Sequence, residues 1–212
     1  MFQPDRVLLL RQIAELGPYI QGLTLDVGAG GYSRYSRFLG SKRGIRLDVS
    51  IKNKPDLVGD AQALPFKDET FDSVVCTQVL GQLGEPDTAT GEFYRVLKPR
   101  GTILLTDNQT AAQQDDPVDY WRFTRSGLER LCRSRGFTII AFRQRGGFFT
   151  MLGQVIIRHL INRFQLYRHP VIGRLCNWPF KLMGGILMAL DRVDQSQANR
   201  KDTIGWLVVG KK

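Results

Sequence analysis

The chain has 212 residues, of which 42% are hydrophobic and 24% are charged, and its formal net charge is +10. This balance is typical of a globular protein and excludes a largely disordered one, and the length suits a single α/β domain with an elaboration. The three cysteines, Cys76, Cys132 and Cys176, are widely spaced, which favours neither a disulfide framework nor a metal site. The apolar patch between Arg6 and Arg11 is too short for a secretory signal, so we expect a cytoplasmic location.

Short apolar runs bounded by turn formers alternate with helical segments along the first half of the chain. The spacing of apolar residues predicts a first helix over residues 5–20, closed by Gly17 and Pro18. Strands are expected at 23–28, 44–50, 56–60, 71–80 and 101–108, with helices around 33–39 and 89–97. Alternation of this kind predicts a parallel sheet with crossover helices.

The second half begins with a polar loop and a further helix. Ser126 is the expected N-cap of that helix, with Glu129 completing a capping box and Gly136 ending it. Two more strands are expected at 137–144 and 203–212, on either side of a helical insertion at about 146–200. The longest uncharged runs of the insertion fall short of the roughly 20 residues that span a bilayer, so no transmembrane segment is expected.

The first strand ends in Asp26 and turns through Gly28, Ala29 and Gly30. Glycine lacks the Cβ that would block a close approach of a cofactor to the backbone. Asp48 ends the second strand about 20 residues later, where a carboxylate can accept hydrogen bonds from ribose hydroxyls. Taken alone, these features fit plain turn geometry or a nicotinamide dinucleotide site as well as any other nucleotide site.

Three further features favour S-adenosylmethionine over a dinucleotide. Ser33 stands where the third glycine of a GxGxxG motif would lie, so the close helix contact over a pyrophosphate is not provided for. Asp60 and Ala61 end the third strand just before the LPF segment, which suits the edge of an adenine ring. Two strands flanking an insertion also differ from the usual second half of a dinucleotide fold.

Four strings, LDVGAG, LDVS, VGDAQALPFKDETFDSVVCTQVL and EFYRVLKPRGTILLTD, follow one another between Leu23 and Asp107. Together they resemble the type 11 methyltransferase domain of the class I S-adenosylmethionine-dependent family. The resemblance implies one Rossmann-like α/β domain over residues 1–212, with a mostly parallel seven-stranded sheet, helices on both faces and an antiparallel last strand. It assigns Asp26, Gly28 and Gly30 to the methionine part of the cofactor, Asp48 to the ribose, Asp60 and Ala61 to the adenine, and Thr77 and Gln78 to the side of the sulfonium.

The chain departs from the family pattern in two places. Many relatives carry a Glu-His pair after the fourth strand, where this chain has Gly81 and Gln82, so side chains near the cofactor pocket are lost. The ProGlyGly of relatives before the fifth strand is Pro99, Arg100 and Gly101 here, which alters a turn. Neither change touches the acidic residues assigned to the cofactor.

The string DPVDYWRFT, residues 116–124, follows the fifth strand at the edge where open α/β sheets bind ligands. It resembles the PHDYYRFT motif of a subgroup associated with bacterial surface polysaccharide or glycolipid biosynthesis, with Val118 in place of the histidine. One interpretation is a loop entering a helix, in which Tyr120, Trp121 and Phe123 are core anchors. The other is a loop that lines the rim of the substrate-binding site.

As a substrate rim, the same loop offers Asp119 as a hydrogen-bond acceptor and Arg122 as an anion clamp. A sulfonium is already an activated electrophile, so methyl transfer chiefly requires alignment and exclusion of water, and a general base is optional. No histidine precedes His159 in the sequence. Asp119 is therefore the first candidate for a base and Tyr120 the second.

The positive charge is concentrated in one stretch, because no acidic residue occurs from Leu131 to Leu190. The basic residues there are Arg133, Arg135, Arg143, Arg145, Arg158, Arg163, Arg168, Arg174 and Lys181. Three interpretations remain open: a helical cap with a solvated basic face, peripheral contact with an anionic membrane, and, less favoured, nucleic-acid binding. His159 and His169 are expected at the surface.

These features favour an enzyme that methylates a small-molecule or lipid-linked acceptor, such as a glycan intermediate, at the inner face of the membrane. One alternative is an RNA methyltransferase. Another is a regulatory or scaffold protein that binds S-adenosylmethionine without turnover, which the missing Glu-His pair and Val118 keep open.

Overall fold

A computed structural model describes residues 1–30, 35–113 and 118–212. Its internal contacts divide the chain into two compact units. The helical unit contains Met1–Arg11, Gln109–Ala112 and Gln144–Gly205, and the sheet unit contains Gln12–Asn108, Gln113–Arg143 and Trp206–Lys212. The single domain over residues 1–212 stays a prediction.

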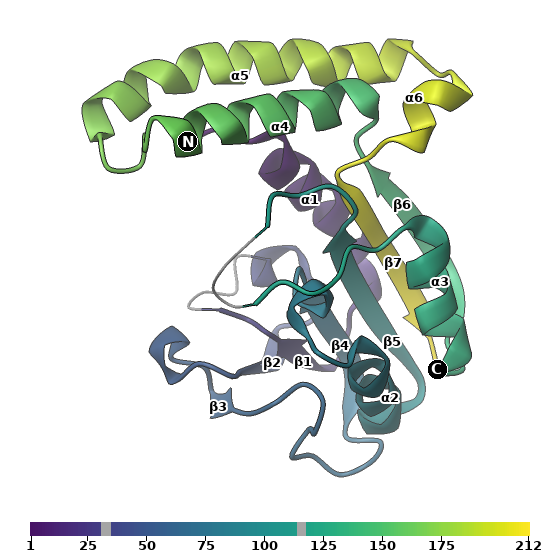
Figure 1. Cartoon of the computed structure of the whole chain (residues 1–212). Helices are drawn as coiled ribbons and strands as arrows, with labels where there is room; N and C mark the ends of the chain where they lie inside the picture. Colours follow the sequence, from purple (N-terminus) through teal and green to yellow (C-terminus); the bar gives the residue numbers. More distant parts are fainter. Residues whose placement is uncertain (31–34, 114–117) are drawn as a thin grey trace. The chain divides into compact units, whose positions relative to one another are not determined.

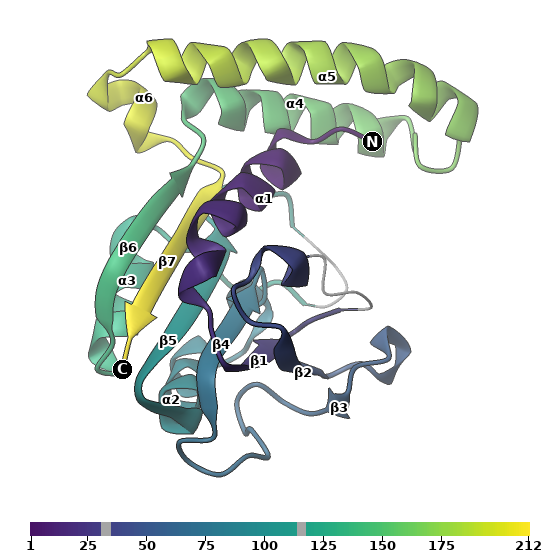
Figure 2. The same ribbon diagram turned by 180° about the vertical axis from the view of Figure 1, so that it is seen from behind.

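The described residues form one seven-stranded sheet. Its strands are β1 (Leu23–Val27), β2 (Arg43–Asp48), β3 (Leu57–Val58), β4 (Phe71–Thr77), β5 (Leu97–Asn108), β6 (Thr138–Arg145) and β7 (Gly205–Lys211), in the spatial order β3-β2-β1-β4-β5-β7-β6. β1 pairs in parallel with β2 and β4, β2 with β3, and β4 with β5. β7 runs against its neighbours, as its arrow shows in Figure 2. The predicted Rossmann-like sheet with an antiparallel last strand is confirmed.

Helices cover both faces of this sheet. Figure 1 shows α2 (Pro86–Val96) and α3 (Arg125–Ser134) in front of it, and Figure 2 shows the end of α1 (Pro4–Leu16) on the other side. Phe93 of α2 and Leu128 of α3 are fully buried in one core cluster with Val74 and Ile103 of the strands. Central parallel strands are buried on both faces, which is why they are almost continuously apolar in sequence.

Two local predictions about helices are wrong. Residues 31–34 lie outside the described part, and the remainder of the helix expected at 33–39 is only the 3-10 turn Ser36–Phe38. The N-cap of α3 is Thr124, whose hydroxyl accepts a hydrogen bond from the Gly127 N–H at 3.1 Å, so Ser126 lies inside the first turn. Glu129 consequently forms no capping box and pairs with Arg133. Thr and Ser are both good N-caps, so residue type alone does not choose between them.

The helical unit contains α4 (Phe148–Arg163), α5 (Pro170–Val193) and α6 (Gln197–Lys201), within the range expected for the insertion. Small residues let α4 and α5 approach closely, since a Cβ added to Gly153 would lie 2.4 Å from the Leu187 side chain. Ile157, Ile161 and Phe180 form a second core cluster between these two helices. Within the described residues, none of the helices combines the length and the hydropathy that crossing a bilayer requires.

Polar contacts fix the start of α4. The Asp191 carboxylate, near the end of α5, accepts hydrogen bonds from the N–H groups of Gly147, Phe149 and Thr150 at 2.7, 3.1 and 3.2 Å. These donors belong to the first turn of α4 and have no partner within the helix, and a carboxylate there also complements the helix dipole. Asp191 therefore ties the carboxyl end of α5 to the amino end of α4.

Candidate functional site

The sheet register brings the predicted residues to one edge. Val27 of β1 lies opposite Leu47 of β2 and Cys76 of β4, and Cys76 lies opposite Leu105 of β5. The residues that follow each of these positions therefore leave the sheet side by side, at the carboxyl ends of four parallel strands. Open α/β sheets bind their ligands at this edge.

The glycine turn after β1 has two glycines with different roles. Gly28 and Gly30 both have left-handed backbones, with φ of +66° and +62°, which other residues rarely adopt. A Cβ on Gly28 would lie 2.3 Å from the Val79 side chain, so packing alone requires glycine there. Among the described residues, no atom lies within 4 Å of a Cβ built on Gly30. This part of the turn therefore leaves the Gly30 backbone uncovered by the described chain. Ser33 lies outside the described residues.

Asp48 is held by three donors at the end of β2. Its Oδ2 accepts a hydrogen bond from the Gly30 N–H at 2.9 Å, and its Oδ1 accepts from the Ser50 N–H at 2.8 Å and from Asn53 Nδ2 at 3.0 Å. A carboxylate can accept about four hydrogen bonds, and the described residues supply these three. Asp48 was predicted from its distance in sequence from the glycine turn. The hydrogen bonds that Ser50 and Asn53 donate to it were not predicted. They depend on the turn that follows β2.

Asp60 and Ala61 begin the loop after β3. The Asp60 Oδ1 accepts a hydrogen bond from the Gln62 N–H at 2.8 Å, which closes a tight turn, and Ala61 is buried. Downstream, the Leu64 N–H donates to Glu92 Oε2 of α2 at 2.8 Å. The loop is thus held from both ends, in the place where an adenine edge was predicted.

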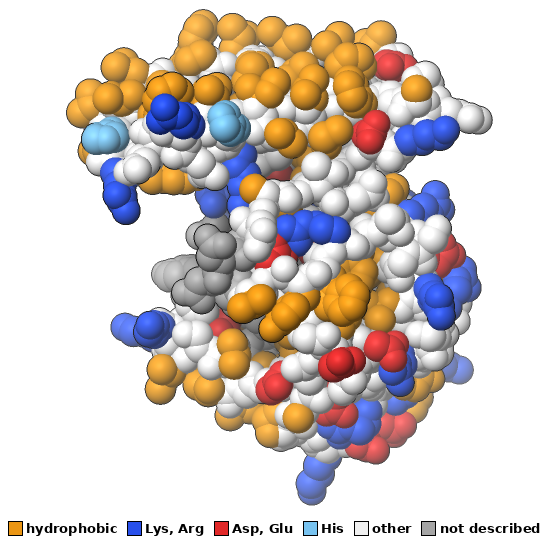
Figure 3. All heavy atoms as spheres, viewed as in Figure 1, with side chains coloured by type: hydrophobic (Ala, Val, Ile, Leu, Met, Phe, Trp, Pro, Cys, Tyr) orange, Lys and Arg blue, Asp and Glu red, His pale blue; other side chains and the backbone are white. Residues whose placement is uncertain are grey.

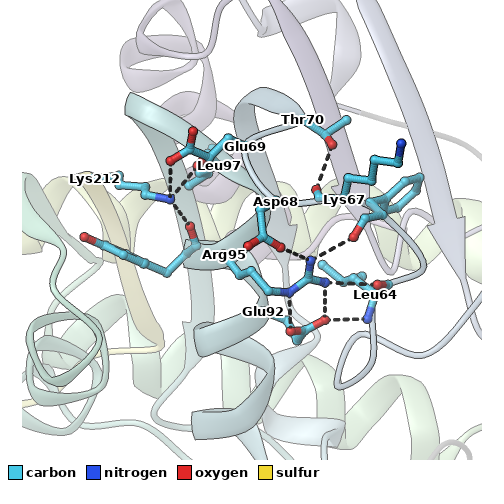
Figure 4. Close-up of polar contacts among 11 residues, drawn as sticks. Leu64, Lys67, Asp68, Glu69, Thr70, Glu92, Arg95, Leu97 and Lys212 are labelled. Carbon is cyan, nitrogen blue, oxygen red and sulfur yellow. Dashed lines mark hydrogen bonds and ion pairs between the residues drawn. The ribbon is translucent and has the colours of Figure 1, made fainter.

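Arg95 of α2 anchors the LPF segment of this loop, as Figure 4 shows. Its guanidinium donates to both carboxylate oxygens of Glu92 at 2.7 Å and to Asp68 at 2.7 Å. It also donates to the carbonyl oxygens of Phe66 and Leu64 at 2.8 and 3.1 Å. The ion pair with Arg95 lowers the pKa of Glu92. Sequence reasoning identified LPF but missed Arg95, because only the folded chain brings α2 beside the loop.

The ends of β4 and β5 carry a polar pair. Gln78 has a φ of +61°, and Asn108 Nδ2 donates to its Oε1 at 2.7 Å. The Gln78 N–H donates to the Thr106 carbonyl oxygen at 2.8 Å, which holds this conformation in place. A non-glycine residue in such a conformation costs about 1–3 kcal/mol, and such residues concentrate at functional sites. Gln78 thus lies at the carboxyl end of β4, and its assignment to the side of the sulfonium stays a prediction.

Gly81 joins the loop after β4 to the DPVDYWRFT segment. Its carbonyl oxygen accepts hydrogen bonds from the N–H groups of Tyr120 and Trp121 at 2.8 and 3.0 Å, and its own N–H donates to Asp107 Oδ2 at 2.8 Å. A Cβ at Gly81 would lie 2.9 Å from the Trp121 carbonyl oxygen. The glycine that replaces the Glu of relatives is therefore the residue that this close backbone approach needs.

The aromatic residues of the segment differ in their exposure to solvent. Phe123 is buried, whereas the exposed fractions of Tyr120 and Trp121 are 58% and 46%. Trp121 is nevertheless held in place, because its Nε1 donates to the Leu83 carbonyl oxygen at 2.9 Å. The interpretation as core anchors holds only for Phe123. Tyr120 and Trp121 form an exposed aromatic rim beside Gly81.

Asp119 and Arg122 are paired with each other. The Arg122 guanidinium contacts both carboxylate oxygens of Asp119, and it also donates to the Trp121 carbonyl oxygen at 2.8 Å. The hydrogen bond that Arg122 donates to Asp119 raises the pKa of Arg122. Each charge is thus balanced by the other, and a base role for Asp119 or a clamp role for Arg122 would require the pair to open. These catalytic roles, and that of Tyr120, stay predictions.

The remaining questions at this edge are whether a cysteine could act as a nucleophile and whether a metal ion could be held. Burial raises the pKa of the Cys76 thiol well above its ordinary value, so Cys76 is a poor nucleophile near neutral pH. Throughout the described ranges, no group of three or more His, Cys, Asp or Glu side chains is placed to hold a metal ion.

Comparison with protein families gives a match to this part of the chain. Residues 25–105 match the family described as "Methyltransferase domain". The matched range begins in β1 and ends in β5, and it includes the glycine turn, Asp48, Asp60, Ala61 and Gln78.

Curated relatives match over short stretches. The demethylmenaquinone methyltransferase of Streptomyces avermitilis is 45% identical over 64 residues, which are 29% of this chain and 28% of that protein. The ubiquinone/menaquinone biosynthesis C-methyltransferase of Ruegeria sp. is 32% identical over 84 residues, which are 40% of this chain and 29% of that protein. The chain thus spans less than a third of the length of these relatives.

Solved structures match over nearly the whole chain at low identity. An S-adenosylmethionine-dependent methyltransferase from Thermotoga maritima has a TM-score of 0.56 at 18% identity, covering 98% of this chain and 94% of that one. A Haemonchus contortus phosphoethanolamine N-methyltransferase bound to S-adenosylhomocysteine has a TM-score of 0.56 at 16% identity, with coverages of 98% and 52%. The [4+2]-cyclase SpnF has a TM-score of 0.56 at 21% identity, with coverages of 98% and 80%. These similarities show a shared fold.

Proposed function

We propose that the chain, which matches the methyltransferase domain family through residues 25–105, is a class I S-adenosylmethionine-dependent methyltransferase that transfers a methyl group to a small-molecule or lipid-linked acceptor. The observation that carries this proposal is the pairing of the glycine turn with Asp48 at the carboxyl edge of the sheet. No described residue comes within 4 Å of a Cβ built on Gly30, and the described residues supply three donors to the Asp48 carboxylate, which can accept about four.

The residues at this edge suit the parts of S-adenosylmethionine. Asp26, Gly28 and Gly30 would hold the methionine part, Asp48 the ribose, Asp60 and Ala61 the adenine, and Gln78 would lie on the side of the sulfonium. These residues fit the cofactor because Gly30 has no Cβ and no described residue crowds it, and because Arg95 holds the loop that carries Ala61. The bound cofactor would supply an activated methyl group, and the protein would align the acceptor and exclude water.

The proposed acceptor is supported by the rim beside the site. Tyr120 and Trp121 expose aromatic surface next to Gly81, which suits an apolar or ring-containing acceptor more than a highly charged one. The names of the curated relatives refer to quinones, and the DPVDYWRFT segment resembles a motif associated with surface polysaccharides and glycolipids. Quinones and glycolipid intermediates both fall within the proposed class of small-molecule or lipid-linked acceptors.

Isothermal titration calorimetry with S-adenosylmethionine tests the cofactor. Asp48→Ala should weaken binding at least about tenfold, since about 1.4 kcal/mol of lost interaction is a factor of ten. Glu129→Ala removes a carboxylate from an exposed ion pair on α3 and is the matched control, with unchanged affinity expected. Absence of binding by the wild type would overturn the proposal, and equal affinities for wild type and Asp48→Ala would remove the role of Asp48.

Transfer of a radiolabelled methyl group tests the acceptor. The protein is incubated with labelled S-adenosylmethionine and either a solvent-extracted bacterial lipid fraction or total RNA. Label in the lipid fraction supports the proposed acceptor class. Label only in RNA would replace it by an RNA methyltransferase, and cofactor binding without transfer to either fraction would favour the regulatory alternative.

A further inference from the structure

The α5 helix exposes an apolar stripe along its whole length. The stripe consists of Val171, Ile172, Leu175, Trp178, Leu182, Ile186, Leu190 and Val193, whose exposed fractions lie between 41% and 81%. After the adjacent pair Val171 and Ile172, these residues recur every three or four positions, so they share one side of the helix. Figure 3 shows hydrophobic side chains gathered along this helix. At about 1.5 Å per residue, the stripe is roughly 36 Å long.

The opposite side of α5 is already packed. Gly173, Phe180 and Gly184 are its buried residues, and a Cβ added to Gly184 would lie 2.3 Å from the Phe2 ring. α5 therefore packs against its own unit through this opposite side, and the exposed stripe is not needed for that packing. Contiguous apolar surface of this extent mostly marks an interaction site.

The α4 helix adds a shorter stripe of the same kind. Phe148, Leu152, Val155 and Ile156 are exposed along one side, and Phe164 and Tyr167 are exposed just beyond its end, with exposed fractions of 39% to 58%. Arg163 lies over the Phe164 ring at 5.8 Å from the ring centroid. Aromatic residues next to basic ones suit the boundary between apolar and charged surroundings.

The charges beside these stripes are mainly positive. Asp191, the acidic residue near the end of α5, is engaged by the first turn of α4. On α5, Arg174, Lys181 and Arg192 are exposed and are separated by seven and eleven residues, both close to whole numbers of helical turns. They therefore form a basic row along one flank of the apolar stripe. Long basic side chains in this position can reach phosphate groups while the stripe is buried.

We propose that the exposed face of the α4–α5 hairpin, formed by the two stripes and their basic flank, binds the surface of an anionic lipid bilayer. The apolar side chains would enter the headgroup region and the arginines and lysine would contact lipid phosphates. A second copy of this chain is disfavoured as the occupant, because pairing two such faces would bring positive charges together. The proposal concerns the helical unit alone and does not depend on the identity of the methyl acceptor.

Sedimentation of the full chain with vesicles tests the proposal. Binding to phosphatidylcholine vesicles should be weak, and adding about 30% phosphatidylglycerol should strengthen it markedly. The double variant Leu175→Gln/Leu182→Gln should lower the partition coefficient about tenfold or more, because two leucines no longer enter the bilayer. The matched control Tyr19→Gln/Ile140→Gln changes two exposed apolar residues outside the hairpin and should bind as the wild type does. Replacing Arg174 and Lys181 by Gln should reduce binding only to the anionic vesicles.

Tryptophan fluorescence supplies a second readout on the folded protein. Anionic vesicles should shift the emission to shorter wavelength, and Trp178→Phe should remove most of that shift while sedimentation persists. Equal sedimentation of the leucine double variant and the wild type, or none by either, would overturn the proposal. So would lipid-independent dimerisation that the double variant abolishes, or RNA binding in place of vesicle binding. Calorimetry with S-adenosylmethionine on the same samples separates these outcomes from a failure of the proposed activity.

Discussion

Replacing Gly81 by glutamate, the residue that many relatives carry after the fourth strand, should destabilise this protein. A Cβ at Gly81 would lie 2.9 Å from the Trp121 carbonyl oxygen and 3.3 Å from Asp107 Oδ1. Because one of these neighbours is backbone, the segment at Tyr120 and Trp121 must move. That movement weakens two hydrogen bonds to the Gly81 carbonyl oxygen, each worth about 0.5–1.5 kcal/mol.

We therefore expect Gly81→Ala to lower the free energy of unfolding by about 1–3 kcal/mol, which agrees with the usual cost of overpacking. In a chain of this size, this corresponds to a fall in melting temperature of roughly 2–12 °C. Gly81→Glu should cost more, because it also places a second carboxylate beside Asp107. Both variants should lose order in the aromatic rim.

Thermal and urea denaturation followed by circular dichroism measure these differences. The matched control is Gln82→His, which restores the second residue of the pair at a half-buried position and should change stability by less than about 0.5 kcal/mol. If Gly81→Ala melts at the wild-type temperature, or if Gly81→Glu is the more stable protein, the close approach described for Gly81 is wrong.

Three further changes test other parts of the molecule. Arg100 has a φ of +64°, so Arg100→Gly should raise the free energy of unfolding in urea by about 0.5–1 kcal/mol. A free energy of unfolding below that of the wild type would contradict the strain at this turn. Asp191→Ala removes the carboxylate from the first turn of α4 and should lower that free energy by about 1–2 kcal/mol, whereas an unchanged urea midpoint would show that the cap contributes nothing. Arg95 lowers the pKa of Glu92, so their pairing stabilises the fold fully above the ordinary glutamate pKa, and this contribution is lost as the pH falls through the lowered value. The stability difference between wild type and Glu92→Gln should thus be largest near neutral pH and shrink in acid, and a difference independent of pH would refute this role.

Much of the site could be predicted because its residues follow directly from local rules. Asp26, Gly28 and Asp48 lie at the ends of strands that the pattern of apolar residues identifies, and parallel strands bring such ends to one edge. The partners of these residues could not be predicted in the same way. Asn53 reaches Asp48 through an intervening turn, and Arg95 reaches the LPF segment from a helix about 30 residues farther along the chain.

By itself, the sequence determined the order of the strands along the chain, the glycine turn, the acidic residues at the carboxyl edge and the absence of acidic residues from Leu131 to Leu190. These follow from periodicity, residue type and spacing, which act over a few residues. Only the tertiary structure decided that Gly81 makes room for the Trp121 backbone, that Asp119 is paired with Arg122 and that α5 exposes its apolar stripe. Each of these depends on which segments, distant in sequence, pack together and which faces are left uncovered, and no local pattern specifies that.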